Sequence, residues 1–244
     1  MRKLVFLYGA FSYVLFLGVF LYAIGFLAGA WVPRGIDDPA PIALGNPLLV
    51  NAALLGLFGI QHTIMARPAF KRWSARFMNP AIERSTFVLV TNLLFVGLFL
   101  MWQPMPETVW AVGGLAANAL WATFALGFAI VLVSTFLIDH FDLFGMKQVT
   151  AYLLGKEHGG PSFKERGLYK MVRHPLMLGF LIAFWSAPVM SQGHLYFAAI
   201  VTAYVFVAVK IEESTLMYLH GDTYGSYRKR VPGILPWRMP RKAA

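Results

Sequence analysis

Four short clusters of ionisable residues interrupt an otherwise apolar chain, and they hold the side chains whose types could do chemistry. Imidazole and carboxylate groups are those that most often move protons in enzymes. The densest cluster places Asp139, His140 and Asp142 within four residues, directly after an apolar segment. Charged groups beside such a segment are costly unless they are paired or hydrated, so we expect this cluster to line a polar cavity. The other clusters are His62, Arg173-His174-Pro175 and Glu212-Glu213.

Each of these last three clusters also has a structural interpretation. Glu212 and Glu213 could form an ordinary charge cluster at a helix end, and the basic pair before Pro175 could contact lipid phosphates at a helix start. His62 could be a hydrogen-bonded histidine at an interface, or could join His140 as a haem ligand. The chain has no cysteine, so cysteine nucleophiles and thiolate metal sites are excluded, and no other metal site is indicated.

The elements that must position these clusters are membrane helices. Of the 244 residues, 58% are hydrophobic and 13% are charged, which is too little charged surface for a water-soluble globule. The same composition excludes intrinsic disorder, and the lack of cysteine excludes a disulfide-stapled secreted domain. Neither a dinucleotide-binding GxGxxG motif nor a phosphate-binding loop is present. We therefore predict an all-α, polytopic integral membrane protein.

Apolar stretches long enough to cross about 30 Å of hydrocarbon predict the individual helices. The first stretch, residues 4–32, is about twice as long as a signal-peptide core, so we expect a retained anchor. Residues 176–209 are too many for one helix and predict a helical hairpin that turns at Gly193. Six spans follow, or five if the last pair forms a re-entrant hairpin. The other predicted spans are residues 47–66, 85–102 and 109–138.

The basic residues test this arrangement independently, because lysine and arginine accumulate on the cytoplasmic side of membrane proteins. Six spans place 20 of the 21 Lys and Arg residues on one side and only Arg34 on the other. Both termini and all four ionisable clusters are then cytoplasmic, which predicts a functional site at the inner boundary of the membrane. This bias, together with contact with anionic membrane lipids, explains the net charge of +10 without a nucleic-acid partner.

The C-terminal third contains motifs whose order and spacing are specific. The motifs are Gly167-Leu-Tyr169, Arg173-His174-Pro175-Leu-Met-Leu-Gly179, Glu212-Glu213 and the segment from Gly221 to Pro232, followed by Leu235-Pro236. Together they resemble the isoprenylcysteine carboxyl methyltransferase and phospholipid methyltransferase superfamily. This resemblance implies a pocket for S-adenosylmethionine that a helical hairpin, residues 175–213, helps to close. It also implies one membrane domain, with four helices in residues 1–138 and a cytoplasm-facing, cofactor-binding part in residues 139–244.

The resemblance implies roles for individual residues around this cofactor. Glu213 or Glu212 would accept hydrogen bonds from the ribose hydroxyls, and Arg173 would balance the methionine carboxylate. Gly179 would let the cofactor approach closely, because it has no side chain. Met177 stands where the family usually has an aromatic residue. The residues that the resemblance places at the cofactor are Gly167, Tyr169, Arg173, His174, Pro175, Leu178, Gly179, Glu212 and Glu213.

The N-terminal two-thirds narrows the resemblance. Residues 61–73, 83–86 and 138–145 resemble the bacterial methanethiol S-methyltransferases, membrane enzymes that form dimethyl sulfide and are similar in turn to a membrane protein family associated with nitrite and nitric oxide metabolism. The resemblance implies an enzyme of the bacterial inner membrane, with a small thiol as substrate and no obligate protein partner. The alternatives are a lipid or isoprenylcysteine-type methyltransferase and a haem-linked membrane protein without catalytic activity.

The implied chemistry is an in-line displacement, in which a thiolate attacks the methyl group of the sulfonium. A small thiol is mostly protonated near neutral pH, so a base within hydrogen-bond reach would raise the reactive fraction. His140 is the expected base, with Asp139 or Asp142 orienting it, and His62 is a second candidate for the same role.

Overall fold

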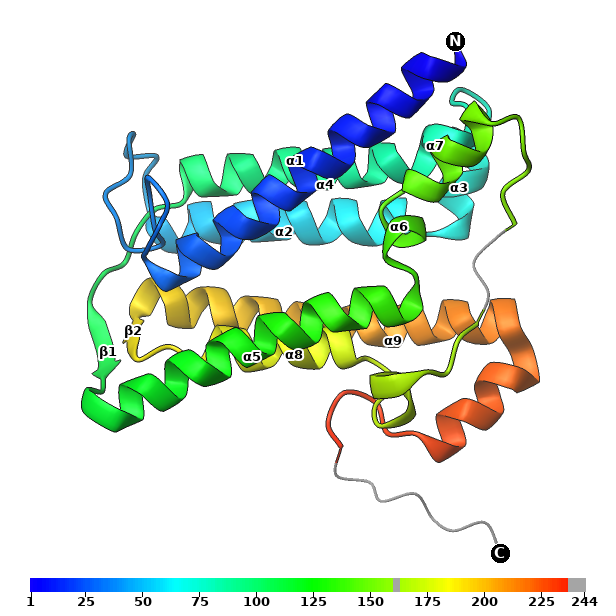
Figure 1. Cartoon of the computed structure of the whole chain (residues 1–244). Helices are drawn as coiled ribbons and strands as arrows, with labels where there is room; N and C mark the ends of the chain where they lie inside the picture. Colours follow the sequence, from blue (N-terminus) through cyan, green and yellow to red (C-terminus); the bar gives the residue numbers. More distant parts are fainter. Residues whose placement is uncertain (160–162, 237–244) are drawn as a thin grey trace, which may run out of the picture. The chain divides into compact units, whose positions relative to one another are not determined.

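The structure is a computed structural model that describes residues 1–159 and 163–236, and nearly all of its regular structure is helical (Figure 1). Two short strands form the one sheet found in these residues. The predicted all-α fold class is therefore confirmed. In chain order the elements are α1 (Arg2–Ala28), α2 (Pro47–Met65), α3 (Pro68–Ser74), α4 (Pro80–Met101), β1 (Thr108–Ala111), α5 (Gly114–Ile138), α6 (His140–Leu143), α7 (Met146–Leu153), η1 (Gly167–Lys170), α8 (Pro175–Trp185), β2 (Val189–Ser191) and α9 (Gln192–Arg230).

Five helices of the described chain are long and apolar enough to cross a membrane, namely α1, α2, α4, α5 and α9. Each of them overlaps one of the predicted apolar stretches. Two details of the prediction are wrong, because residues 109–111 form β1 rather than the start of a helix, and Gly193 lies inside α9 rather than in a turn. The remaining predicted span is the 11-residue helix α8, which is about 16 Å long and covers only about half of the hydrocarbon thickness. The described residues thus have one long apolar helix fewer than the six predicted, and the expected alternative, a re-entrant hairpin made by the last pair, does not describe α9, which is itself long enough to span.

Helix α8 is short because the chain after Trp185 contains Pro188, which cannot continue a helix. Beyond this point the chain is extended and reaches β2, which pairs with β1 just before α5. The backbone N–H of Val112 donates to the carbonyl of Pro188 at 2.9 Å, and Trp110 Nε1 donates to that of Ala187 at 3.1 Å. The segment from α8 to β2 therefore runs back along α5 to the strand that precedes it (Figure 1).

The described residues form two compact units. The first contains residues 1–108, 141–159 and 191–196, and the second contains residues 109–140, 163–190 and 197–236. In the first unit, α1 packs against α4 and α7, and α2 packs against α4. Gly9 permits the close approach of α1 to α7, because a Cβ there would lie 2.6 Å from Val149 Cγ2.

Arg34 is the one basic residue that the charge count places apart from the others, and its side chain caps the C-terminus of α4 in the first unit. Its side chain is buried, and its Nη1 donates to the carbonyls of Phe99 at 2.6 Å and Leu100 at 2.9 Å. Nη2 donates to the carbonyl of Trp102. These are the carbonyls that have no partner at the C-terminus of a helix, here α4, where the helix dipole also favours a cation. The position of this arginine is thus explained by helix capping.

The second unit contains α5, α8 and most of α9. Helices α5 and α8 lie side by side and meet at two glycines (Figure 1). A Cβ on Gly127 would lie 2.7 Å from the carbonyl oxygen of Gly179, and a Cβ on Gly179 would lie 2.7 Å from that of Gly127. Helices α8 and α9 share an apolar core with the segment that follows α9, centred on Val205, Val209 and Ile234.

Candidate functional site

Glu213 is the centre of a buried charge cluster in the second unit. It lies 21 residues after the start of α9, which is about 32 Å along the helix. Its Oε1 accepts a hydrogen bond from Arg173 Nε at 2.7 Å and lies 2.6 Å from Arg173 Nη2 and 3.2 Å from His174 Nε2. Its Oε2 lies 3.3 Å from Arg228 Nε. The chain itself therefore supplies partners for both carboxylate oxygens.

Arg173 and His174 are held in this cluster by the backbone that follows α9. The N–H of Arg173 donates to the carbonyls of Pro232 at 2.8 Å and Gly233 at 2.9 Å, and the N–H of His174 donates to Gly233 at 3.2 Å. Arg173 Nη1 also donates to the carbonyl of Val231. The Arg-His-Pro motif and the end of the last motif are thus one structural unit, although they are about 60 residues apart in the sequence.

Glu212 and Tyr224 lie beside this cluster, and they differ from Glu213, whose two carboxylate oxygens both have partners within the chain. The Glu212 side chain is 47% exposed, against 9% for Glu213, and its Oε2 lies 3.5 Å from His174 Nδ1. Tyr224 is 1% exposed, and its hydroxyl has no aligned hydrogen-bond partner among the described residues. An open carboxylate, an imidazole and a hydroxyl fit a ligand that has hydroxyl and charged groups of its own.

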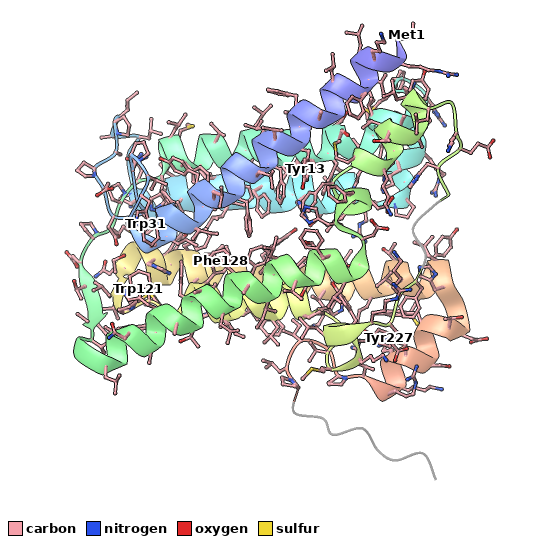
Figure 2. The ribbon with its side chains drawn as sticks, viewed as in Figure 1. Met1, Tyr13, Trp31, Trp121, Phe128 and Tyr227 are labelled. Atoms are coloured by element: carbon pink, nitrogen blue, oxygen red, sulfur yellow. The ribbon has the colours of Figure 1, made fainter. Side chains whose placement is uncertain are left out.

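Aromatic side chains pack the end of α9 against η1. The Tyr227 hydroxyl, labelled in Figure 2, donates to the carbonyl of Tyr169 at 2.6 Å. The ring of Phe163 packs edge-on against Tyr227 and Tyr224, at centroid distances of 5.2 and 5.9 Å. Burial raises the pKa of Tyr169 above its ordinary value, so its phenol stays protonated at neutral pH. This packing brings the segment before η1 close to the charge cluster around Glu213.

The remaining residues of the motifs 167–169 and 173–179 contribute to backbone conformation and helix packing. Gly167 begins η1 with φ +51°, a conformation that favours glycine. Pro175 is fully buried at the start of α8, and Leu178 packs against the core of α8 and α9. The close approach at Gly179 is made by the backbone of α5.

His140 and Asp139 follow α5 in the second unit, and they have different partners. His140 is 4% exposed; its Nδ1 lies 2.8 Å from Thr135 Oγ1, and its ring stacks on Phe136 at 4.3 Å and 5°. Asp139 Oδ2 accepts from Lys164 Nζ at 3.2 Å, and the same Nζ donates to the carbonyl of Ile138 at 2.8 Å. Burial lowers the pKa of His140, so the imidazole is neutral at pH 7.

Asp142 and His62 lie in the first unit. Asp142 Oδ1 lies 2.7 Å from His158 Nε2 and accepts from Gln148 Nε2 at 3.2 Å. His62 lies near the end of α2 between the rings of Phe58 and Phe87, and its Nδ1 has no hydrogen-bond partner among the described residues.

Comparison with known proteins places the chain among its relatives. It is 48% identical to methanethiol S-methyltransferase 2 of Bradyrhizobium diazoefficiens over 99% of this chain and 93% of that protein. It is 47% identical to the methanethiol S-methyltransferase of Mycobacterium tuberculosis over 97% of both chains. The chain belongs to the methanethiol S-methyltransferase family. Human nurim is a more distant relative, 30% identical over 72% of this chain and 70% of its own. No family model and no solved structure matches the chain.

Membership of the methanethiol S-methyltransferase family makes the chain a methyltransferase and confirms the predicted family. In this family member, the structure brings Arg173, His174, Glu212 and Glu213 into one cluster, as the motifs led us to expect.

Sequence reasoning missed several residues that contact the predicted ones. These residues are Thr135, His158 and Arg228. Arg228 was visible only as one basic residue of a motif. A single threonine, or a lone histidine in a polar connection, forms no motif that would predict a functional role. Tyr224 was also missed, and it lies close enough to Glu213 and Arg173 for their charges to act on its hydroxyl.

Proposed function

We propose that this chain transfers a methyl group from S-adenosylmethionine to a small thiol and converts methanethiol to dimethyl sulfide. The observation that supports this most directly is its similarity, over nearly the whole length, to proteins named methanethiol S-methyltransferase. Because the similarity extends over 97% to 99% of the chain, it includes every ionisable cluster described above.

The cluster around Glu213 is our proposed cofactor site. Bound S-adenosylmethionine would supply a methyl group activated by a positively charged sulfur. Glu212 would accept hydrogen bonds from the ribose hydroxyls, because it is the more exposed of the two carboxylates. His174 and Tyr224 would contribute the other polar contacts, and Tyr169 and the backbone from Phe163 to Gly167 would line the adenine side. Arg173 and Glu213 would hold His174 in place.

The thiol must lose its proton before it can act as a nucleophile. We propose that His140 removes this proton, because it is a buried, neutral imidazole whose hydrogen bond to Thr135 fixes the ring. In this proposal Asp139 holds Lys164 at the end of α5, and Asp142 holds His158. The expected role of Asp139 or Asp142 in orienting His140 stays a prediction.

We propose that the site faces the cytoplasm and that both termini lie there. The basic residues of the sequence favour this orientation. The fold is compatible with it, because the segment from α8 to β2 returns along the whole of α5. The buried Arg34 at the C-terminus of α4 does not count against it, since capping accounts for its position.

Headspace gas chromatography tests the reaction directly. Membranes that contain the protein are given S-adenosylmethionine and methanethiol, and we expect dimethyl sulfide. Glu212→Gln should weaken binding of S-adenosylhomocysteine by about 10- to 100-fold in isothermal titration, as expected for loss of a charged hydrogen-bond acceptor. Lys210→Gln is the matched control, because Lys210 is an exposed residue one-half turn earlier on the same helix.

Other outcomes would point to other functions. Label from S-adenosylmethionine in the lipid or peptide fraction, with no volatile product, would indicate a lipid or isoprenylcysteine-type enzyme and refute the proposed substrate. A strong Soret band after purification, with no dependence on S-adenosylmethionine, would indicate a haem protein. Unchanged binding in Glu212→Gln would refute the proposed contact with the cofactor.

A further inference from the structure

The hydrogen bonds of Thr135 determine which nitrogen of His140 holds the proton. Thr135 lies in the last turn of α5, five residues before His140. Its hydroxyl donates to the carbonyl of Leu132 at 2.7 Å, and the same oxygen lies 2.8 Å from His140 Nδ1. A hydroxyl has one hydrogen and a carbonyl oxygen can only accept, so this hydrogen is directed to Leu132. The bond to His140 then requires an N–H on Nδ1.

The proton on Nδ1 settles the state of the other ring nitrogen. A neutral imidazole has one N–H and one nitrogen with a lone pair. The side chain of His140 is buried and stacked on Phe136, which favours the neutral form. Nε2 is therefore the nitrogen with the lone pair, the form that can accept a proton.

We infer that Thr135 is a positioning residue that holds His140 as its Nδ1–H tautomer and so makes Nε2 the catalytic base. This inference rests on the proposed function and adds to it the identity of the basic atom and of the residue that sets it. Hydrogen bonding to one ring nitrogen is a general way in which proteins select a histidine tautomer. Here the acceptor is a neutral threonine hydroxyl, itself fixed by the backbone of α5.

The proton transfer can be written in full for this arrangement. The S–H bond of the thiol breaks and its electron pair stays on sulfur, while the proton forms a bond to the Nε2 lone pair. His140 becomes an imidazolium, with Nδ1–H still donating to Thr135. The sulfur then attacks the methyl group, and the bond between that methyl carbon and the donor sulfur breaks with its electron pair going to that sulfur. Loss of the Nε2 proton to water restores the base.

A charged pair also lies at the end of α5, where Lys164 Nζ donates to Asp139 Oδ2 at 3.2 Å. Burial is the one cause that lowers the pKa of His140. A neutral partner does not stabilise the imidazolium as a carboxylate would, so it favours return of the proton to water after each turnover.

Nitrogen NMR reports the tautomer without any need for activity. The full-length protein, labelled with 15N-histidine in detergent micelles, should show His140 protonated at Nδ1, with the signal assigned by its loss in His140→Gln. Thr135→Val removes the hydroxyl, and Thr135→Ser keeps it. We expect a mixture of tautomers and a kcat lower by about tenfold or more in Thr135→Val, within the range for general-base catalysis. Thr135→Ser should keep the parent tautomer and a kcat within about twofold.

The outcomes separate this inference from the proposed function. An Nε2–H tautomer in the parent protein overturns the inference, as does a Thr135→Val variant with the parent tautomer and kcat. If Thr135→Val fails to fold, the tautomer of the parent and of Thr135→Ser decides. A parent protein that forms no dimethyl sulfide refutes the proposed function, whereas the NMR comparison still tests the control of His140 by Thr135. Unchanged affinity for S-adenosylhomocysteine in both variants is expected, because Thr135 is not in the cofactor cluster.

Discussion

Replacement of Glu213 by glutamine should destabilise the protein strongly, even though it only exchanges one carboxylate oxygen for an amide NH2 group. The substitution removes the negative charge that faces Arg173 and His174, whose side chains are 12% and 5% exposed. Removal of one partner from a buried ion pair costs about 3–5 kcal/mol, because the other charge stays buried without compensation. Arg228 is 54% exposed at its side chain, so its share of this loss is small.

The neighbouring acidic residue provides the matched comparison. Glu212→Gln changes a side chain that is 47% exposed and has one partner at 3.5 Å, so its effect on stability should be within about 1 kcal/mol. For a chain of this size, 1 kcal/mol corresponds to about 2–4 °C in the unfolding midpoint. Glu213→Gln should therefore lower the midpoint by about 10 °C, and Glu212→Gln by at most a few degrees.

Thermal unfolding of the two variants in the same detergent, followed by tryptophan fluorescence, measures this difference. Titration with S-adenosylhomocysteine at a temperature where both are folded should show the reverse order, with the larger loss of affinity in Glu212→Gln. Equal midpoints for the two variants would refute the assignment of Glu213 as the buried centre of the cluster. A Glu213→Gln variant that is as stable as the parent but does not bind would show that Glu213 contacts the cofactor directly.

Three further predictions follow from other parts of the structure. Gly179→Ala should lower the free energy of unfolding by about 1–3 kcal/mol, because its Cβ would meet the backbone of α5. Gly56→Ala in α2 is the control and should not destabilise the protein, because there is open space around Gly56. Chemical denaturation compares the two variants. Arg34→Lys keeps the charge but cannot reach three carbonyls at once, so the unfolding midpoint should fall; a midpoint equal to that of the parent would contradict the cap. Burial lowers the pKa of His140 in the folded protein, so the unfolded chain binds the proton more readily. Between pH 7 and pH 5 the parent should therefore lose more stability than His140→Gln. Unfolding midpoints of the two proteins, measured across that range, test this prediction.

Much of the fold followed from local composition. Apolar stretches of about 20 residues identify membrane helices because the hydrocarbon excludes unpaired backbone groups, whatever the tertiary arrangement. The five long helices, α1, α2, α4, α5 and α9, match these stretches. The short α8 was harder to predict, because its sequence is as apolar as a span and only Pro188 and the pairing of β2 with β1 limit the helix.

The candidate site could be predicted in part, because its motifs are specific in order and spacing. The sequence led to Arg173, His174, Glu212 and Glu213, and the structure joins these four. Family membership also followed from the motifs and is confirmed by the relatives.

What the sequence determined by itself was the class of protein, the five long helices and four residues that meet around Glu213, since each depends on composition or on a motif. The tertiary structure decided the partners: His158 for Asp142, Thr135 for His140, and helix α5 for Gly179. A hydrogen bond or a close approach depends on distances of a few tenths of an ångström between side chains that can be far apart in the chain. Local sequence does not fix such distances, because packing of whole helices sets them.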